Sequence, residues 1–120
     1  MTPEGRIKNK LDRMLKLYHS VVWYFCPQAG AFGRAGVPDR IVCVDGYFIG
    51  IEVKADAKKR PTKLQEKCMA DIEKVGGRCF IVNSDETIAA VERFIIDRLI
   101  SRVSQKLDPK DYPLAGNNKG

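Results

Sequence analysis

The sequence predicts an α/β fold with a mixed sheet built around a central β-hairpin, in the order α-β-β-β-α-β-α. Two strand-like runs, residues 40–44 and 47–53, flank Asp45-Gly46, a dipeptide typical of two-residue hairpin turns. A helix-length segment separates this hairpin from the apolar run 79–82, which indicates a parallel strand after a crossover helix. Apolar residues at helical spacing near each end of the sequence predict two further helices.

The first predicted helix has a clear start. Thr2 suits the N-cap, Pro3 suits the first helical position, and Glu4 is an acidic residue in the first turn. Basic residues occupy one side of this helix. The expected buried side consists of Ile7, Leu11, Met14, Leu15 and Tyr18.

The remaining elements follow from composition and turn residues. Residues 21–25 are β-branched and aromatic, so we expect a short strand that ends before Pro27. Pro61-Thr62 starts another helix, which Gly76-Gly77 ends. The expected apolar stripe of this helix is Leu64, Cys68, Ile72 and Val75.

The last helix begins at Ser84 or Asp85. A length of 120 residues with 44% hydrophobic content indicates one domain, which we expect to cover residues 1–107, with a flexible tail over 108–120. No apolar run approaches the roughly 20 residues that span a bilayer, and the first residues do not resemble a signal peptide. We therefore expect a cytoplasmic protein that does not enter membranes.

Cysteine and charge usage narrow the function further. The four cysteines are widely spaced and form no C-x-x-C pair, which predicts buried, reduced thiols. Because His19 is the single histidine in the sequence, a zinc site of cysteines and histidines is not expected. The formal net charge of +6 suits a polyanionic partner such as nucleic acid.

The hairpin register brings two acids together. If Asp45-Gly46 is the turn, Val44 pairs with Tyr47, and counting outward makes the sixth pair Asp39 with Glu52. Like charges in such directly opposed positions destabilise a sheet. Lys54 lies two residues beyond Glu52 and points to the same side, because side chains alternate along a strand.

A divalent cation would relieve the repulsion between these acids. Mg²⁺ or Mn²⁺ binds carboxylate oxygens, lowers the pKa of a bound water and polarises a phosphate, while a nearby ammonium stabilises developing negative charge. Asp39, Glu52 and Lys54 therefore predict phosphodiester hydrolysis. The structural alternative makes Asp39 a turn residue and leaves Glu52 and Lys54 facing solvent.

The motifs around these residues resemble a known family. Gly36-Val37-Pro38-Asp39, followed by the hairpin and Glu52-Val53-Lys54, resembles the G-x-P-D and E-V-K motifs of the PD-(D/E)XK nuclease superfamily. The closest resemblance is to its VRR-NUC (virus-type replication-repair nuclease) domains, and it continues at Gln65. It implies a restriction-endonuclease-like core and Mg²⁺- or Mn²⁺-dependent cleavage.

The resemblance also implies roles for individual residues. Asp39, Glu52 and the backbone carbonyl of Val53 would hold the metal, and Lys54 would be the catalytic lysine. Glu4 matches an acidic residue that family members often place near the metal, although the helix dipole also favours an acid there. Gln65 matches the family too, but Thr62-Lys63-Leu64-Gln65 is equally a capping box.

Compact members of this family resemble archaeal Holliday-junction resolvases, which act as homodimers. The resemblance implies a structure-selective endonuclease for branched DNA such as four-way junctions, with no organic cofactor. Two alternatives remain open: a nuclease for flaps, nicks or duplex DNA, and a non-catalytic nucleic-acid-binding module. The candidate phosphate contacts are Arg34, Lys58, Lys59, Arg60 and Lys63.

Overall fold

The computed structural model describes residues 1–28 and 33–104. Their elements are α1 (Pro3–Leu17), β1 (Val22–Phe25), β2 (Arg40–Val44), β3 (Tyr47–Val53), α2 (Lys63–Lys74), β4 (Arg78–Val82) and α3 (Asp85–Ser104). The predicted order α-β-β-β-α-β-α is confirmed. Residues 105–107 of the expected domain and the expected tail 108–120 lie outside the described residues.

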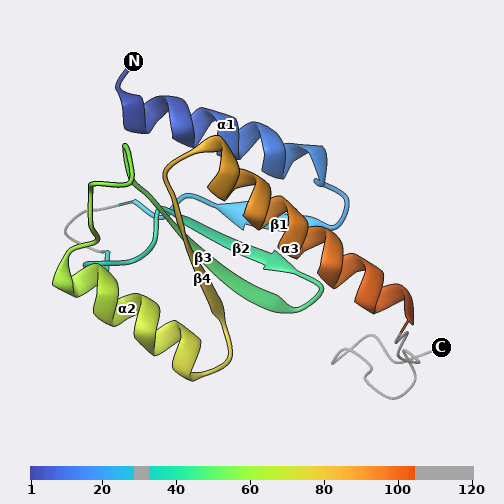
Figure 1. Ribbon diagram of the computed structural model, residues 1–120. Helices are drawn as coiled ribbons and strands as arrows, with labels where there is room; N and C mark the ends of the chain where they lie inside the picture. The colour runs from blue at the N-terminus through green and yellow to red at the C-terminus, as the bar shows by residue number, and fades with distance from the viewer. Residues whose placement is uncertain (29–32, 105–120) are drawn as a thin grey trace.

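The strands form one mixed sheet in the order β1-β2-β3-β4 (Figure 1). The β1–β2 and β2–β3 pairs are antiparallel, and β3 and β4 are parallel. Parallel neighbours need a long crossover, which α2 supplies. The predicted mixed sheet with a central hairpin is therefore confirmed.

The turn between β2 and β3 sets the register of the hairpin. Asp45 has φ 50° and Gly46 has φ 79°, and two positive φ angles are what a type I′ turn requires. Val44 faces Tyr47, and the pairing runs outward to Arg40 opposite Ile51. The same count brings Asp39 opposite Glu52 one step further on, as predicted.

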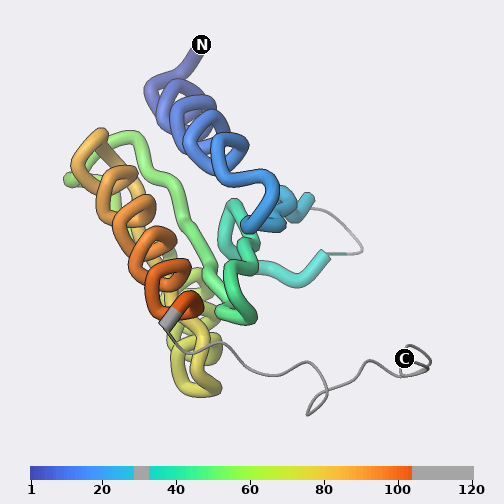
Figure 2. The backbone as a smooth tube through the Cα atoms, turned by 90° about the vertical axis from the view of Figure 1, so that its right-hand side faces the viewer, coloured from blue at the N-terminus to red at the C-terminus, as the bar shows by residue number. Residues whose placement is uncertain are grey.

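Helices α1 and α3 cover one face of the sheet and lie next to each other in two perpendicular views (Figures 1 and 2). Their buried residues share a core with Val42 and Val44 of β2 and with Ile49, Ile51 and Val53 of β3, which are alternate positions on one face of the sheet. None of the helices described is long and apolar enough to cross a membrane. The buried core consists of Leu11, Met14, Leu15, Val22, Val42, Val44, Ile49, Ile51, Val53, Val82, Ile88, Val91 and Ile95.

Helix α2 packs against β4 on the opposite face. Cys68 is buried there, but Leu64 and Val75 are 59% and 84% exposed, so the stripe predicted for this helix was wrong at both ends. Helical spacing determines which residues share a face of the helix, but only the part of that face that another element covers becomes buried. The prediction of buried thiols also fails for Cys26 and Cys43, which are exposed at the β1 side of the sheet; all four cysteines are free.

The loop before β2 docks closely on α2. Gly36 has φ +81°, and a Cβ atom built there would lie 2.6 Å from the backbone oxygen of Leu64. Backbone atoms at a helix start cannot move aside as a flexible side chain can. Gly36 therefore permits both the local conformation and the close approach.

We predict that Gly36→Ala destabilises the protein more than Gly46→Ala does. Both glycines have positive φ, which costs an alanine about 1 kcal/mol. Only Gly36 also has a backbone clash, which adds about 1–3 kcal/mol of overpacking. The free energy of unfolding in urea measures the difference, and equal losses in the two variants would contradict close docking of this loop.

Candidate active site

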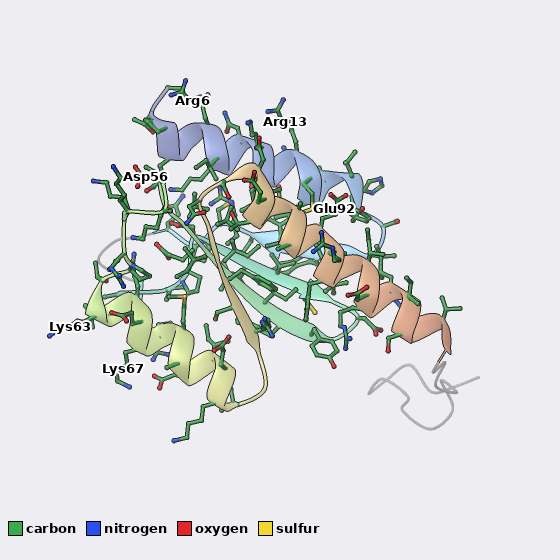
Figure 3. All side chains as sticks on the ribbon, viewed as in Figure 1. Arg6, Arg13, Asp56, Lys63, Lys67 and Glu92 are labelled. Carbon is green, nitrogen blue, oxygen red and sulfur yellow. The ribbon has the colours of Figure 1, made fainter. Side chains whose placement is uncertain are left out.

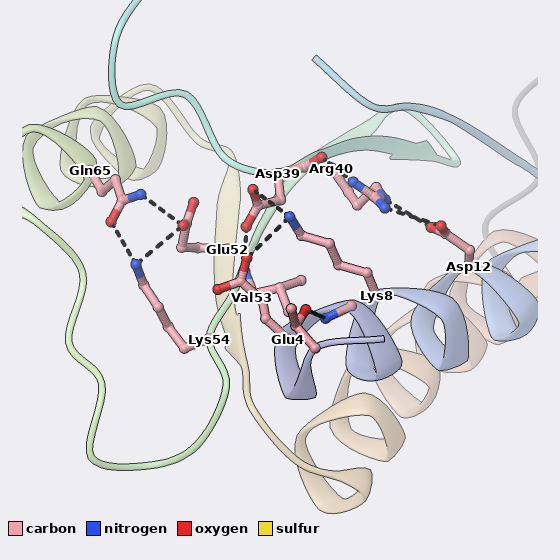
Figure 4. A network of polar contacts seen from close by, with 11 residues as sticks. Glu4, Lys8, Asp12, Asp39, Arg40, Glu52, Val53, Lys54 and Gln65 are labelled. Atoms are coloured by element: carbon pink, nitrogen blue, oxygen red, sulfur yellow. Dashed lines mark hydrogen bonds and ion pairs between the residues drawn. The ribbon is translucent and has the colours of Figure 1, made fainter. Parts of the chain in front are cut away.

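The predicted site lies at the open end of the hairpin, where α1 and α2 both reach it (Figure 4). Asp39 directly precedes β2, Glu52 is near the end of β3, and Lys54 follows that strand. Gln65 belongs to the first turn of α2. The structure thus brings together four predicted residues from two strand ends and one helix.

The two carboxylates lie close together, and one of them is buried. Asp39 Oδ2 accepts a hydrogen bond of 2.7 Å from the backbone N–H of Val53. The Glu52 side chain is only 3% exposed, and its Oε2 accepts a hydrogen bond of 2.8 Å from Gln65 Nε2. Within the described residues Glu52 Oε1 is buried without a hydrogen-bond partner. The alternative in which Glu52 faces solvent is therefore wrong.

The surroundings of Glu52 disfavour its charge. Burial, followed by the negative charge of Asp39, raises the pKa of Glu52 from 4.5 to about 7, although the ammonium of Lys54 acts in the opposite direction. Near neutral pH the site thus holds two carboxylates whose charge its own residues balance incompletely. A cation or a proton at Glu52 would relieve this repulsion.

Gln65 caps the start of α2 and also contacts two of the predicted site residues. The side-chain Oε1 of Gln65 accepts a hydrogen bond of 2.8 Å from the backbone N–H of Thr62. The backbone N–H of Gln65 donates to Thr62 Oγ1, which completes a capping box. The same Oε1 lies 3.0 Å from Lys54 Nζ. Because its Nε2 donates to Glu52, Gln65 connects Lys54 to Glu52, and Lys54 Nζ also lies 3.5 Å from Glu52 Oε2.

Glu4 approaches the site through Lys8, a residue that the sequence analysis missed. Lys8 Nζ lies 3.2 Å from Glu4 Oε2 and 3.6 Å from Asp39 Oδ1. Burial lowers the pKa of Lys8, but the charges of Asp39 and Glu4 outweigh this effect and raise it. The i,i+4 spacing of Glu4 and Lys8 was visible in the sequence, whereas the contact with Asp39 depends on how α1 is oriented on the sheet.

A second ion pair joins α1 to the start of β2. The guanidinium of Arg40 contacts both carboxylate oxygens of Asp12 at 2.8 and 3.0 Å, and its Nη1 donates to the backbone oxygen of Asp39 at 2.7 Å. Arg40 is buried, so this two-pronged contact fixes the backbone of Asp39 firmly. Neither Asp12 nor Arg40 was predicted from the sequence as a residue of the site.

Among the described residues, no ion pair joins a candidate phosphate contact to Asp39 or Glu52. Arg34 lines a cleft of about 440 Å³ beside Asp39 and Gln65, and its guanidinium lies 3.7 Å from Asp71. Lys63 begins α2 and points away from the sheet (Figure 3). The exposed residues of the loop between β3 and α2 include Lys58, Lys59 and Arg60.

The donor atoms fit a hard divalent cation. Asp39 and Glu52 offer carboxylate oxygens, which Mg²⁺ and Mn²⁺ prefer, and the buried Glu52 Oε1 has no partner from the described residues. The backbone carbonyl of Val53 stays the predicted third ligand. No group of three acidic, histidine or cysteine side chains in the described part of the chain is arranged to hold a metal, so Glu4 does not form a cluster with the other two acids.

The element order α-β-β-β-α-β-α and the four-stranded mixed sheet match a PD-(D/E)XK-like α/β fold. A solved structure described as "VRR_NUC domain" is similar to this chain with a TM-score of 0.66 and 23% sequence identity, over 78% of this chain and 97% of that one. The chain thus has the fold of a VRR-NUC domain, as the motifs predicted. No protein-family model and no curated protein matches the sequence.

We predict that in metal-free buffer Glu52→Gln is more stable than the wild type, and that this difference in the free energy of unfolding grows as pH rises. The folded state binds the Glu52 proton more tightly than the unfolded chain, so ionised Glu52 lowers wild-type stability progressively between about pH 4.5 and 7. A pKa shift of this size corresponds to about 3 kcal/mol. Urea unfolding across this pH range measures the difference between variant and wild type, and a constant difference would contradict the raised pKa.

Proposed function

We propose that this protein is a metal-dependent endonuclease that hydrolyses phosphodiester bonds in DNA. The observation that carries the proposal is the buried Glu52 carboxylate, with one oxygen unpartnered among the described residues, beside a second carboxylate and an ammonium. A buried charge without full compensation costs stability, so a purely structural site would not favour it. A bound cation would compensate this charge, and the same cation would act on a phosphate.

Each residue has a role in the proposed reaction. Asp39 and Glu52, with the carbonyl of Val53, would hold Mg²⁺ or Mn²⁺. A metal held there would lower the pKa of a bound water and polarise the scissile phosphate. The ammonium of Lys54 orients the attacking water or stabilises the negative charge that develops on the phosphate.

Gln65 positions the reacting groups. It contacts both Lys54 Nζ and Glu52 Oε2, and its own side chain is restrained by the capping box at the start of α2. A restrained amide limits the rotamers available to Lys54, which keeps the ammonium near the acids. Glu4 acts through Lys8 rather than as a direct partner of the acids.

The proposed substrate is branched DNA such as a four-way junction. The support is the resemblance of compact VRR-NUC domains to junction resolvases and the net charge of +6. Two nicks on one junction need two active sites, so the proposal includes a homodimer. The backbone would be gripped by Arg34, Lys58, Lys59, Arg60 and Lys63. A cytoplasmic location stays a prediction.

We predict that Asp39→Asn and Glu52→Gln each abolish cleavage in Mg²⁺ or Mn²⁺ while leaving DNA binding largely intact. Lys54→Met should lower the cleavage rate by about 10²–10³, the effect of removing one stabilising group from a transition state. Glu86→Gln, an exposed change on α3, is the control and should cleave normally. Single-turnover assays and gel shifts provide the measurements.

Two outcomes would contradict this mechanism. One is full cleavage by either acid variant, and the other is cleavage by the wild-type protein in EDTA. Salt-dependent DNA binding by the wild type, with no cleavage in either metal, would instead favour the non-catalytic binding module.

We predict faster cleavage of a four-way junction than of a flap, a nicked duplex or a plain duplex of matched sequence. The expected reason is that two protomers present their sites to two strands of one junction at once. Labelled substrates measured in parallel, with the solution mass of the protein, test both parts. Equal rates on all four substrates, or a monomer that is fully active on junctions, would exclude structure selectivity through a dimer.

A further inference from the structure

Lys8 brings a positive charge from α1 to a carboxylate of the site. Its Nζ lies 3.6 Å from Asp39 Oδ1 and 3.2 Å from Glu4 Oε2, so one ammonium lies between an acid of the site and an acid of its own helix (Figure 4). Its side chain is 30% exposed, compared with 24% for Asp39 and 42% for Glu4. The Glu4 side of this arrangement is therefore nearer to solvent.

The two oxygens of Asp39 are in different situations. Oδ2 accepts the short hydrogen bond from the backbone N–H of Val53, which fixes the carboxylate in place. Oδ1 faces the ammonium of Lys8 instead. A divalent cation that binds this carboxylate meets an existing positive charge, and two like charges at such distances repel strongly in a partly buried site.

We propose that Lys8 is an internal counter-ion that competes with the divalent cation for Asp39, and that Glu4 receives the ammonium when the cation binds. This inference rests on the proposed metal-dependent function. Lys8 holds the Asp39 carboxylate in the metal-free protein and so sets the cation concentration at which the site fills. Glu4 favours cation binding by drawing Lys8 away, without being a ligand itself.

Lys8 and Glu4 should have opposite effects on the affinity of the site for the cation. Removing the charge of Lys8 should tighten cation binding, because the competitor is gone. Removing the charge of Glu4 should weaken it, because Lys8 is left with Asp39 as its acidic partner. Loss of α1 packing alone would weaken binding in both variants, so the difference in sign distinguishes competition from a structural role.

Calorimetric titration of the metal-free protein with Mn²⁺ tests this directly. Lys8→Met should bind Mn²⁺ roughly fivefold more tightly than wild type, the factor that an ion pair of this exposure supplies. Lys8→Arg, which keeps the charge, should stay near the wild-type affinity. Lys10→Met is the matched control, because it removes an ammonium from the same helix whose partner is Asp85, outside the site.

The double variant Glu4→Gln/Lys8→Met separates the two possible actions of Glu4. If Glu4 acts through Lys8, Glu4→Gln has no effect on Mn²⁺ affinity once Lys8 is replaced. If Glu4→Gln weakens binding equally in both backgrounds, Glu4 is a ligand and its assigned role is overturned. Thermal unfolding should also show a lower melting temperature for metal-free Lys8→Met and a larger rise on adding Mn²⁺.

The outcomes distinguish this inference from the function on which it rests. Mn²⁺ binding that Asp39→Asn abolishes, but that Lys8→Met leaves unchanged or weakens, overturns the competition and leaves the metal site intact. A wild-type protein that does not bind Mn²⁺, or that binds it equally well as Asp39→Asn, overturns the metal site and the competition together.

Discussion

The buried carboxylate of Glu52, placed beside Asp39, is the constraint to which the surrounding structure responds. Each neighbouring donor stabilises part of this negative charge. The backbone N–H of Val53 donates a hydrogen bond to Asp39, while Gln65 and Lys54 contact Glu52 Oε2. These contacts leave Glu52 Oε1 without a partner from the described residues and its pKa near 7. The site is therefore organised around a charge that its own residues do not neutralise, as a cation site requires.

The acids meet because the backbone around them is unusually close-packed. A two-residue turn fixes the hairpin register, and glycines let the preceding loop reach its position. A Cβ atom at Gly50 would lie 2.9 Å from Pro38 Cγ, and one at Gly36 would meet the start of α2. The order of glycine, proline and aspartate thus has a physical reason: the loop packs over β3 and against α2, and Asp39 follows at the end of the hairpin.

The sequence was sufficient for features set by local rules. Turn chemistry predicted the hairpin, counting strand pairs outward from the turn predicted that Asp39 and Glu52 meet, and the capping box at Thr62 and Gln65 was visible in the sequence. It was insufficient where the answer depended on how elements pack. Leu64 and Val75 had the right helical spacing but are exposed, because spacing alone does not determine which part of a helix face is covered. The contact of Lys8 with Asp39 crosses from a helix to a loop 31 positions away and follows from the rotation of α1 about its axis.

Helix α1 therefore belongs to the site as well as to the core. Leu11 and Leu15 bury one side of this helix under the sheet, while Glu4, Lys8 and Asp12 repeat at i,i+4 spacing along another. Lys8 contacts Asp39, and Asp12 contacts Arg40, which follows Asp39 in the sequence. Alternating charges on the helix thus pair with consecutive residues at the start of β2. Because the apolar side fixes the rotation of α1, the packing of the core also determines where the ammonium of Lys8 lies. Core substitutions that rotate α1 would thus change the electrostatics of the acids without touching them.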